Sequence, residues 1–242
     1  MTASAPQFTD AKDRLAVALD VPDAQAALDL VDRLGDSCRV LKVGMELYYA
    51  GGNALLEELR SRGYRIFLDL KLHDIPNTVA GGIRSVATSG AELLTVHAGG
   101  GGAMLTAAAE AARAPGAPRL LAVTVLTSMD AAELKAAGVC SAPADQVLRL
   151  ARLAKSSGIN GMVCSAEEVA ALRSELGPEA LLVVPGIRPA GSALNDQRRI
   201  ATPAEAISSG ASMLVVGRPI TRAANPDEAA RAVVKEIESA MA

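Results

Sequence analysis

The sequence predicts an α/β protein with the (β/α)8 architecture of a TIM barrel, formed as a single domain over residues 1–242. Strand-like and helix-like segments alternate along the chain, and the unit repeats eight times in 242 residues. The strand-like runs are continuously apolar, as is typical of parallel strands that are covered on both faces. No linker or low-complexity block interrupts the alternation, which favours one domain.

The expected elements follow one another in a regular order. The expected strands are Leu15–Val21, Arg39–Gly44, Arg65–Lys71, Leu93–Ala98, Arg119–Leu126, Gly161–Cys164, Leu181–Pro185 and Met213–Val216. The expected helices are Asp23–Leu34, Gly52–Ser61, Asn77–Ser89, Gly102–Arg113, Ala131–Ala136, Ala144–Ser157, Ala166–Glu175, Pro203–Ser208 and Asp227–Ala240. A doubly wound open sheet would show a similar alternation. The first strand–helix turn, residues 20–23, lacks the GxGxxG pattern, which argues against a dinucleotide-binding sheet.

The composition excludes several classes of function. Hydrophobic residues make up 50% of the chain and charged residues 21%, so a large core is expected and disorder is not. Aromatic residues make up only 2%, which argues against stacking platforms for single-stranded nucleic acid. The net charge of −3 gives no general attraction to polyanions, so no nucleic-acid partner is expected and a phosphate group would have to be bound locally.

Cysteine usage and hydropathy predict a cytoplasmic protein. The three cysteines are scattered and show no CxxC spacing, which is typical of reduced thiols. No apolar stretch approaches the length of a membrane span, and Met1–Asp13 lacks the apolar region of a signal peptide. We therefore expect no association with a membrane.

Polar residues occur at the ends of most expected strands. In a (β/α)8 barrel the carboxyl ends of all strands meet on one rim, where active sites are found. The residues that we expect on this rim are Asp20, Lys42, Asp69, Lys71, His97, Thr127, Ser128, Arg188 and Arg218. Their convergence from distant positions is a stronger signal than any single motif.

The third strand provides the densest group of charges. Asp69 and Lys71 are two residues apart, so on a strand they share a face, and Asp74 follows just past the strand end. Burying charges is costly unless they are paired or used. A structural ion pair is one interpretation. A catalytic cluster is favoured because Asp20 and Lys42 are expected on the same rim.

A lysine between carboxylates is held in its protonated form. Protonated Lys71 could act as a general acid or stabilise developing negative charge, but it would be a poor Schiff-base nucleophile, which argues against a class I aldolase. Two aspartates and a histidine could hold Mg²⁺, yet Lys71 would compete for that space as a built-in cation. His73 and His97 show no metal-ligand spacing, so we expect no metal.

Two glycine–arginine turns predict a phosphate site. Pro185-Gly-Ile-Arg188-Pro follows the seventh strand and Val216-Gly217-Arg218-Pro follows the eighth, the loops where barrel enzymes often bind phosphate. Gly217 permits close backbone approach and Arg218 offers a planar fork to two phosphate oxygens. Each turn alone could be a plain loop, but their joint position favours phosphate binding.

Two further polar segments are candidates for ligand contact. Thr127 and Ser128 could hydrogen-bond a heterocycle or a sugar, or they could cap the helix expected near Ala131. Gln197 lies in the long segment Gly191–Arg199, which could close over a ligand as part of a lid.

The residues 67–78, with the sequence FLDLKLHDIPNT, resemble the signature segment of the orotidine 5′-phosphate decarboxylase family. The resemblance extends along the chain in the right order. The other matching motifs are Ala18-Leu-Asp20, Leu41-Lys-Val-Gly44, Val125-Leu-Thr-Ser128, Pro185-Gly-Ile-Arg-Pro189, Asp196-Gln-Arg-Arg199 and Val216-Gly-Arg-Pro-Ile220.

The resemblance implies a carboxy-lyase that converts orotidine 5′-monophosphate to UMP, the last step of de novo pyrimidine biosynthesis, without metal or organic cofactor. It also implies a homodimer in which Asp74 and Thr78 reach into the partner's site. Lys71 would stabilise and then protonate the carbanion at C6. Asp69, with Lys42 and Asp74, would hold Lys71 in a preorganised array.

The remaining contacts to the substrate follow from the same resemblance. Asp20 and Lys42 would bind ribose hydroxyls, and Thr127 with Ser128 corresponds to the fifth-strand motif. The phosphate-binding end comprises Pro185, Arg188, Gln197, Gly217 and Arg218. Binding energy from this remote group can drive loop closure and assembly of the site.

Two alternative functions remain open from the sequence. Sister enzymes such as 3-keto-gulonate-6-phosphate decarboxylase or hexulose-phosphate synthase resemble the Asp-x-Lys-x-x-Asp core but use Mg²⁺ and an enediolate. The segment Asp74-Ile-Pro-Asn-Thr78 and Gln197 favour the nucleotide enzyme. A non-catalytic barrel that only binds a phosphosugar or nucleotide would leave the charged cluster unused.

Overall fold

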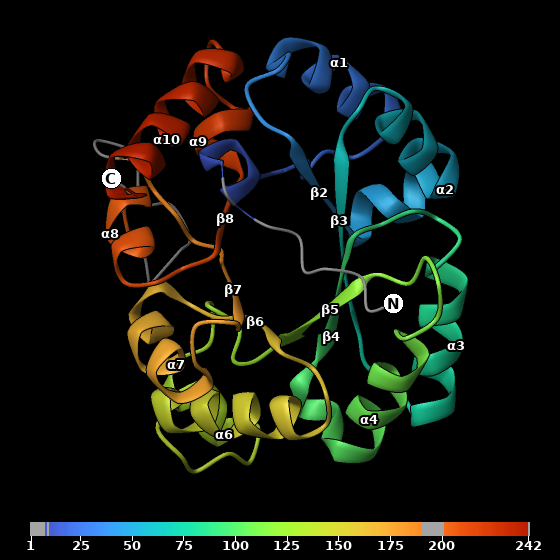
Figure 1. Ribbon diagram of the computed structural model, residues 1–242, viewed down its shortest axis with the longest axis vertical. Coiled ribbons are helices and arrows are strands. Elements are labelled where there is room, and N and C mark those ends of the chain that lie inside the picture. The colour runs from blue at the N-terminus through green and yellow to red at the C-terminus, as the bar shows by residue number, and fades with distance from the viewer. Residues whose placement is uncertain (1–7, 9, 190–200, 242) are drawn as a thin grey trace.

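Eight parallel strands form a closed barrel in the computed structural model, which describes residue 8 and residues 10–189 and 201–241 (Figure 1). The strands are β1 (Leu15–Ala18), β2 (Val40–Gly44), β3 (Arg65–Leu72), β4 (Leu93–His97), β5 (Arg119–Val123), β6 (Gly161–Val163), β7 (Leu181–Val184) and β8 (Met213–Val216). Each strand pairs with its successor in the sequence, and β1 closes the ring by pairing Leu15 with Leu214 of β8. This confirms the predicted (β/α)8 barrel.

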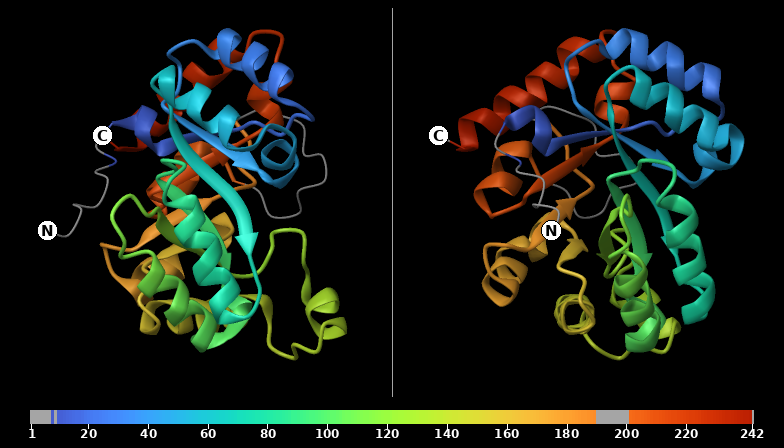
Figure 2. Two further views of the ribbon diagram at one scale, coloured as in Figure 1. Left: turned by 90° about the vertical axis from the view of Figure 1, so that its right-hand side faces the viewer. Right: turned by 45° about the vertical axis from the view of Figure 1, so that its right-hand side comes forward.

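The helices surround the barrel, as the two rotated views in Figure 2 also show. They are α1 (Ala24–Leu34), α2 (Met45–Ser61), α3 (Pro76–Val86), α4 (Gly101–Ala111), α5 (Ala131–Ala136), α6 (Pro143–Ser156), α7 (Val169–Leu176), α8 (Pro203–Ser208), α9 (Arg218–Thr221) and α10 (Pro226–Met241). Short 3-10 turns add η1 (Ala11–Arg14), η2 (Ala98–Gly100) and η3 (Ala166–Glu168). No helix in the described part of the chain is long and apolar enough to span a membrane.

Differences from the predicted elements are concentrated at element ends. Helix α2 begins at Met45, directly after β2, and Gly52 interrupts its helical geometry with φ of 57°, so the sequence pattern indicated only the second half. Helix α9 and η1 are each four residues long, too short to show helical periodicity. Strand β5 ends at Val123 rather than Leu126, so residues 124–126 belong to the loop that also contains Thr127.

The interior of the barrel is a packed core and not a channel. Its side chains are mostly small or aliphatic, and Phe67 of β3 is the largest of them. At one end, Phe8 packs against this cluster, and the Arg65 guanidinium lies 5.7 Å from the centre of its ring. A second cluster fills the layer between strands and helices. A ligand therefore has access from the opposite end, at the carboxyl ends of the strands.

Candidate active site

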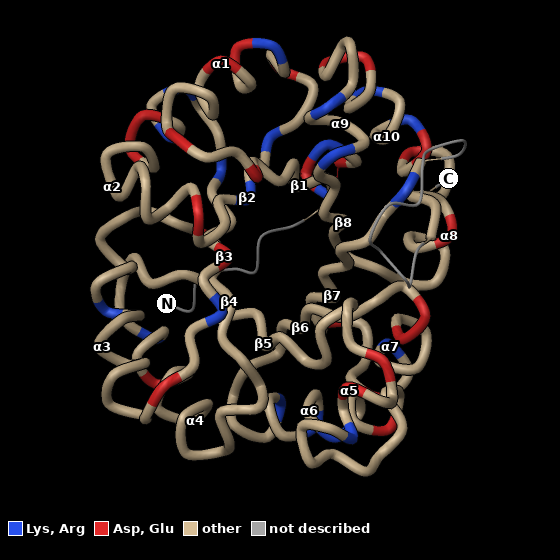
Figure 3. Tube along the Cα trace, turned by 180° about the vertical axis from the view of Figure 1, so that it is seen from behind, with Lys and Arg blue, Asp and Glu red and all other residues tan. Residues whose placement is uncertain are grey.

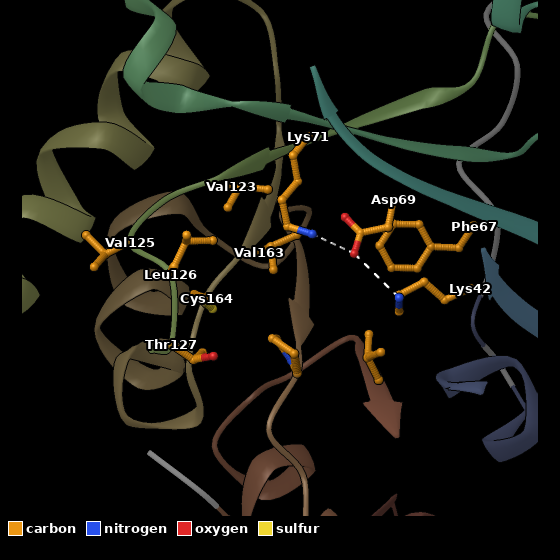
Figure 4. Close-up of a pocket in the computed structure, with 12 residues that line it drawn as sticks. Lys42, Phe67, Asp69, Lys71, Val123, Val125, Leu126, Thr127, Val163 and Cys164 are labelled. Atoms are coloured by element: carbon orange, nitrogen blue, oxygen red, sulfur yellow. Dashed lines mark hydrogen bonds and ion pairs between the residues drawn. The ribbon is translucent and has the colours of Figure 1, made fainter. Parts of the chain in front are cut away.

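Four alternating charges from three adjacent parts of the barrel form a continuous chain of contacts. Lys42 Nζ of β2 lies 3.0 Å from Asp20 Oδ1, in the loop after β1, and 3.6 Å from Asp69 Oδ2 of β3. Lys71 Nζ lies 2.8 Å from the same Asp69 oxygen. Figure 4 shows that Asp69 stands between the two ammonium groups. The structure thus brings together Asp20, Lys42, Asp69 and Lys71, which were expected on one rim.

Burial makes these contacts strong. The side chains of Lys42 and Asp69 are only 10% and 14% exposed, that of Lys71 is 27% exposed, and Asp20 is largely open to solvent. Burial by itself would raise the pKa of Asp69, but the charges of Lys42 and Lys71 and the hydrogen bonds from Lys71 and Thr95 outweigh it and lower that pKa. Asp69 is therefore held as a carboxylate.

The contact between Asp69 and Lys71 depends on an irregularity of β3. Four steps along β3, from Leu68 to Leu72, face only two steps along β4, so the ladder contains a bulge. Among the described residues, Lys71 is the one non-glycine with a positive φ, at 50°. Simple alternation of side chains, on which the sequence prediction relied, does not describe this segment. The two side chains meet because the backbone turns at Lys71.

Thr95 of β4 completes the cluster, and the sequence analysis did not identify it. Its Oγ1 donates a hydrogen bond to Asp69 Oδ1 at 2.9 Å and accepts one from the backbone N–H of Lys71 at 2.8 Å. Thr95 is fully buried. The sequence marks Thr95 only as a polar residue inside the apolar run of β4, the strand that pairs with the charged strand β3.

A cavity of about 160 Å³ adjoins the charged array. One wall is formed by Lys42, Asp69 and Lys71, and the facing wall is apolar (Figure 4). The other lining residues are Phe67, Val123, Val125, Leu126, Thr127, Val163, Cys164, Pro185 and Val215. The apolar side of the cavity continues in the strands behind it, because β6, β7 and β8 contain no charged residue (Figure 3). The cavity can hold a partly polar ring with one edge against the ammonium groups.

The residues predicted to bind phosphate lie at the rim near β7 and β8. Pro185 lines the cavity, and buried Arg188 donates from Nη1 to the Ile187 carbonyl at 2.9 Å. Gly217 adjoins the array, since a Cβ at this position would lie 3.5 Å from Asp20 Oδ2. Arg218 begins α9. The whole segment 191–199, including Gln197, lies outside the described residues.

The loop after β5 resolves one open alternative. Thr127 lines the cavity, and Ser128 is exposed beside it. The N-cap of α5 is Asp130, whose Oδ1 accepts from the backbone N–H groups of Ala132 and Glu133, both at 3.0 Å. The interpretation of Thr127 and Ser128 as helix caps is therefore wrong. Both remain candidates for ligand contact.

Asp74 and Thr78 do not join the array within one chain. Asp74 is exposed, and its Oδ1 accepts from the Ile75 backbone N–H at 2.6 Å. Among the described residues of the single chain, Asp74 forms no ion pair with Lys42 or Lys71. Thr78 is exposed in the first turn of α3. These two residues face solvent beside Ile75, which is 67% exposed.

The two histidines pack against each other near Lys71. The ring centres of His73 and His97 are 5.4 Å apart. Burial, followed by the proximity of His73 and Lys71, lowers the pKa of His97. Across the described residues, no three His, Cys, Asp or Glu side chains form a group that could hold a metal ion.

The chain is similar to a family of decarboxylases over most of its length. Residues 13–233 match the family model described as "Orotidine 5'-phosphate decarboxylase / HUMPS family". The orotidine 5′-phosphate decarboxylase of Moorella thermoacetica is 51% identical over 235 residues, covering 94% of this chain and 93% of that protein. That of Methylobacterium sp. (strain 4-46) is 54% identical over 232 residues, with 95% and 97% covered. The crystal structure of orotidine 5′-phosphate decarboxylase from Lactobacillus acidophilus has a TM-score of 0.82 and 41% identity, covering 92% of this chain and 98% of that one.

Proposed function

The chain belongs to the orotidine 5′-phosphate decarboxylase / HUMPS family, and from this premise we propose how its residues convert orotidine 5′-monophosphate to UMP. The enzyme is a carboxy-lyase of pyrimidine biosynthesis. In this reaction the bond between C6 and the carboxylate breaks, CO₂ leaves, and the electron pair remains on C6. The pyrimidine ring delocalises that pair poorly, so the protein has to stabilise it and supply a proton.

Lys71 is the residue that we assign to both tasks. Its ammonium group lines the cavity and lies 2.8 Å from Asp69 Oδ2. Positive charge fixed beside C6 stabilises the transition state without reorganisation, because the array is already in place before the substrate binds. Proton transfer from Nζ to C6 then yields UMP and a neutral amine, which regains its proton from solvent. The alternation Asp20–Lys42–Asp69–Lys71 is the observation that supports this assignment.

Asp69 and Lys42 hold Lys71 in position. Asp69 Oδ2 is shared by the two ammonium groups, so Lys42 orients the carboxylate that in turn orients Lys71. In this proposal the substrate carboxylate lies near Asp69 before it departs. Repulsion between the two carboxylates could add to the rate by raising the ground state, but preorganisation of the array is sufficient to explain the arrangement.

The other contacts follow from position on the rim. Asp20 and Lys42 would bind the ribose hydroxyls, since Asp20 is the open end of the array. Thr127 and Ser128 would hydrogen-bond the pyrimidine above the cavity. The phosphate would be bound by the loops after β7 and β8, with Pro185, Arg188, Gly217 and Arg218, and by Gln197, which lies outside the described residues.

We also propose a homodimer in which Asp74 and Thr78 complete the partner's site. Ile75, next to Asp74, is 67% exposed, and Met45 and Tyr49 in the first half of α2 are 44% and 77% exposed. Helices α2 and α3 are neighbours on the outside of the barrel (Figure 1). Exposed large apolar residues next to an exposed catalytic candidate are typical of an interface that forms part of a site.

The decisive test is turnover of orotidine 5′-monophosphate by the full chain in EDTA. We expect the substrate absorbance to fall while UMP and CO₂ form in stoichiometric amounts. Addition of Mg²⁺ should not increase the rate. Activity that needs Mg²⁺, or activity on a hexulose phosphate alone, would contradict the proposal and favour the sister enzymes. Binding of UMP without consumption of the substrate would indicate a non-catalytic binding protein.

A further inference from the structure

We propose that Thr95 is a positioning residue for the decarboxylation, because its hydroxyl fixes the Asp69 carboxylate and the Lys71 backbone in a single hydrogen-bond relay. The inference rests on the function proposed above for Asp69 and Lys71. Thr95 is fully buried and does not line the cavity, so it cannot touch the substrate. It acts through the two residues that do.

The chemistry of the three groups fixes the direction of the relay. A backbone N–H can only donate and an ionised carboxylate can only accept, whereas a hydroxyl does both. The Lys71 N–H therefore donates to Thr95 Oγ1 at 2.8 Å, and the single hydroxyl proton goes to Asp69 Oδ1 at 2.9 Å. One threonine thereby connects the main chain of the proton donor to the carboxylate that orients its side chain.

The relay replaces a ladder bond that the bulge removes. Residues 69–71 of β3 lie between two of its points of register with β4, Leu68 with Leu94 and Leu72 with Val96. In a regular ladder the N–H of a strand residue donates to a carbonyl of the neighbouring strand. At Lys71 it donates to a side chain instead, while φ is 50°, a conformation that residues other than glycine rarely adopt. Thr95 is thus the partner that holds the left-handed turn from which the Lys71 side chain enters the cavity.

The two oxygens of Asp69 have separate partners. Oδ2 lies near both Lys71 and Lys42, and Oδ1 is occupied by Thr95. With both oxygens engaged, rotation of the carboxylate about its Cβ–Cγ bond is blocked. Without the hydroxyl, Oδ1 would lose its partner in a buried position, and the carboxylate could rotate and draw Lys71 Nζ away from C6.

The test compares Thr95→Val with Thr95→Ser in the full-length enzyme. Valine has nearly the same shape as threonine but lacks the hydroxyl, and serine retains it. Because displacements of about 1 Å in a catalytic group can reduce the rate by roughly 100-fold, we expect Thr95→Val to lower kcat by about 10- to 100-fold. KM and the affinity for UMP should change little, since no contact to the ligand is lost. Thr95→Ser should restore most of kcat.

Thr124 provides a matched control. It is also a buried threonine near the end of the neighbouring strand, and its Oγ1 donates to the Val163 carbonyl at 2.9 Å, outside the charged array. Thr124→Val should therefore keep kcat close to that of the natural enzyme. Equal losses of kcat in Thr95→Val and Thr124→Val, or a normal kcat in Thr95→Val, would overturn the inference.

If Thr95→Val does not fold, Thr95→Asn decides the question. Asparagine has both a donor and an acceptor in one side chain, so it can restore the relay but not the shape of threonine. Activity in the asparagine variant supports the relay, and a folded asparagine or serine variant without activity contradicts it. The natural enzyme is the reference throughout. If it is inactive, the proposed function is refuted. If it is active and Thr95→Val has a normal kcat, only the inference about Thr95 is refuted.

Discussion

Lys71 Nζ lies 2.8 Å from Asp69 Oδ2 although the backbone at Lys71, with φ of 50°, has left the regular strand. The ion pair is therefore a product of a bulge and not of a straight strand. A left-handed residue that is not glycine is strained, and strain of this kind is commonly found at functional sites.

Lys71→Ala should lower kcat by several orders of magnitude, about 10⁴-fold or more, because the variant loses both the fixed charge and the general acid. The fold should persist, since the side chain is partly exposed at the rim. Single-turnover kinetics and thermal unfolding measure the two effects. Lys155→Ala on α6 is a suitable control, because that lysine donates to the Leu176 carbonyl at 3.0 Å and does not belong to the charged array. A kcat near normal in Lys71→Ala would exclude the proton-donor role.

Arg218→Ala should mainly weaken the binding of phosphorylated ligands. Hydrogen bonds to charged groups contribute about 1.5–3 kcal/mol, so the affinity for UMP should fall at least about tenfold. The affinity for uridine, which has no phosphate, should hardly change. Titration calorimetry with both ligands gives the comparison, and Arg222→Ala at the end of α9 is the control. Equal losses for the two ligands would show that Arg218 does not bind the phosphate.

Gly44→Ala should reduce kcat/KM without a large loss of stability. The backbone at Gly44, with φ of −85° and ψ of 178°, suits alanine. The added Cβ, however, would lie 3.3 Å from Lys42 Nζ and 3.7 Å from Asp20 Oδ1, so Lys42 would have to move. We expect roughly a tenfold loss by analogy with small displacements in other sites. Gly99→Ala is the control, because a Cβ there meets no atom within 4 Å.

The stability of the enzyme should decrease as the pH falls below about 6.5 in part because of His97. Its pKa is lowered in the folded state, chiefly by burial. Below the ordinary pKa of histidine, near 6.5, the unfolded chain therefore binds more protons than the folded one, and protonation favours unfolding. Urea unfolding should show that the free energy of unfolding decreases less between pH 7.5 and pH 5.5 in His97→Gln than in the natural enzyme. An unchanged pH dependence would contradict this assignment.

Mixing Lys71→Ala with Asp74→Ala should restore activity that neither variant has alone. In the proposed dimer, a mixed pair contains one site with Lys71 from one chain and Asp74 from the other, and that site is intact. Steady-state assays after mixing measure the recovery. Failure to recover activity in a protein shown to exchange subunits would mean that Asp74 does not serve the partner's site.

The dimer itself can be disrupted at Ile75. Ile75→Asp places a charge in the exposed apolar surface next to Asp74 and should shift the protein to monomers in sedimentation experiments, with loss of activity. Met241→Asp is the control. Met241 is also an exposed apolar residue, at 38% exposure, but it lies at the end of α10 and not beside Asp74. A monomeric natural protein with full activity would contradict the shared site.

The sequence predicted the parts of the site whose residue type is unusual for their position. Lysine and aspartate at the end of apolar strands are conspicuous, so Lys42, Asp69 and Lys71 could be placed on one rim. Thr95 could not be found in this way, because threonine is common in strands and its importance depends on a neighbouring strand. The bulge was equally hidden, since no glycine marks the left-handed residue. Whether Asp74 and Thr78 act across an interface stays a prediction, because it depends on a second chain.

The two walls of the cavity come from separate parts of the sequence. The charged groups are supplied by residues 20–71, whereas most of the apolar wall belongs to β5–β8 and their loops, residues 123–215. In the proposed mechanism, the first part performs bond cleavage and protonation, and the second part defines the shape of the ring that can enter. Substitutions in the later strands can therefore change which heterocycle is accepted while the charged array stays intact. Directed evolution of this barrel toward other acidic heterocycles should accordingly target Val123, Val163 and Val215 and leave the early strands unchanged.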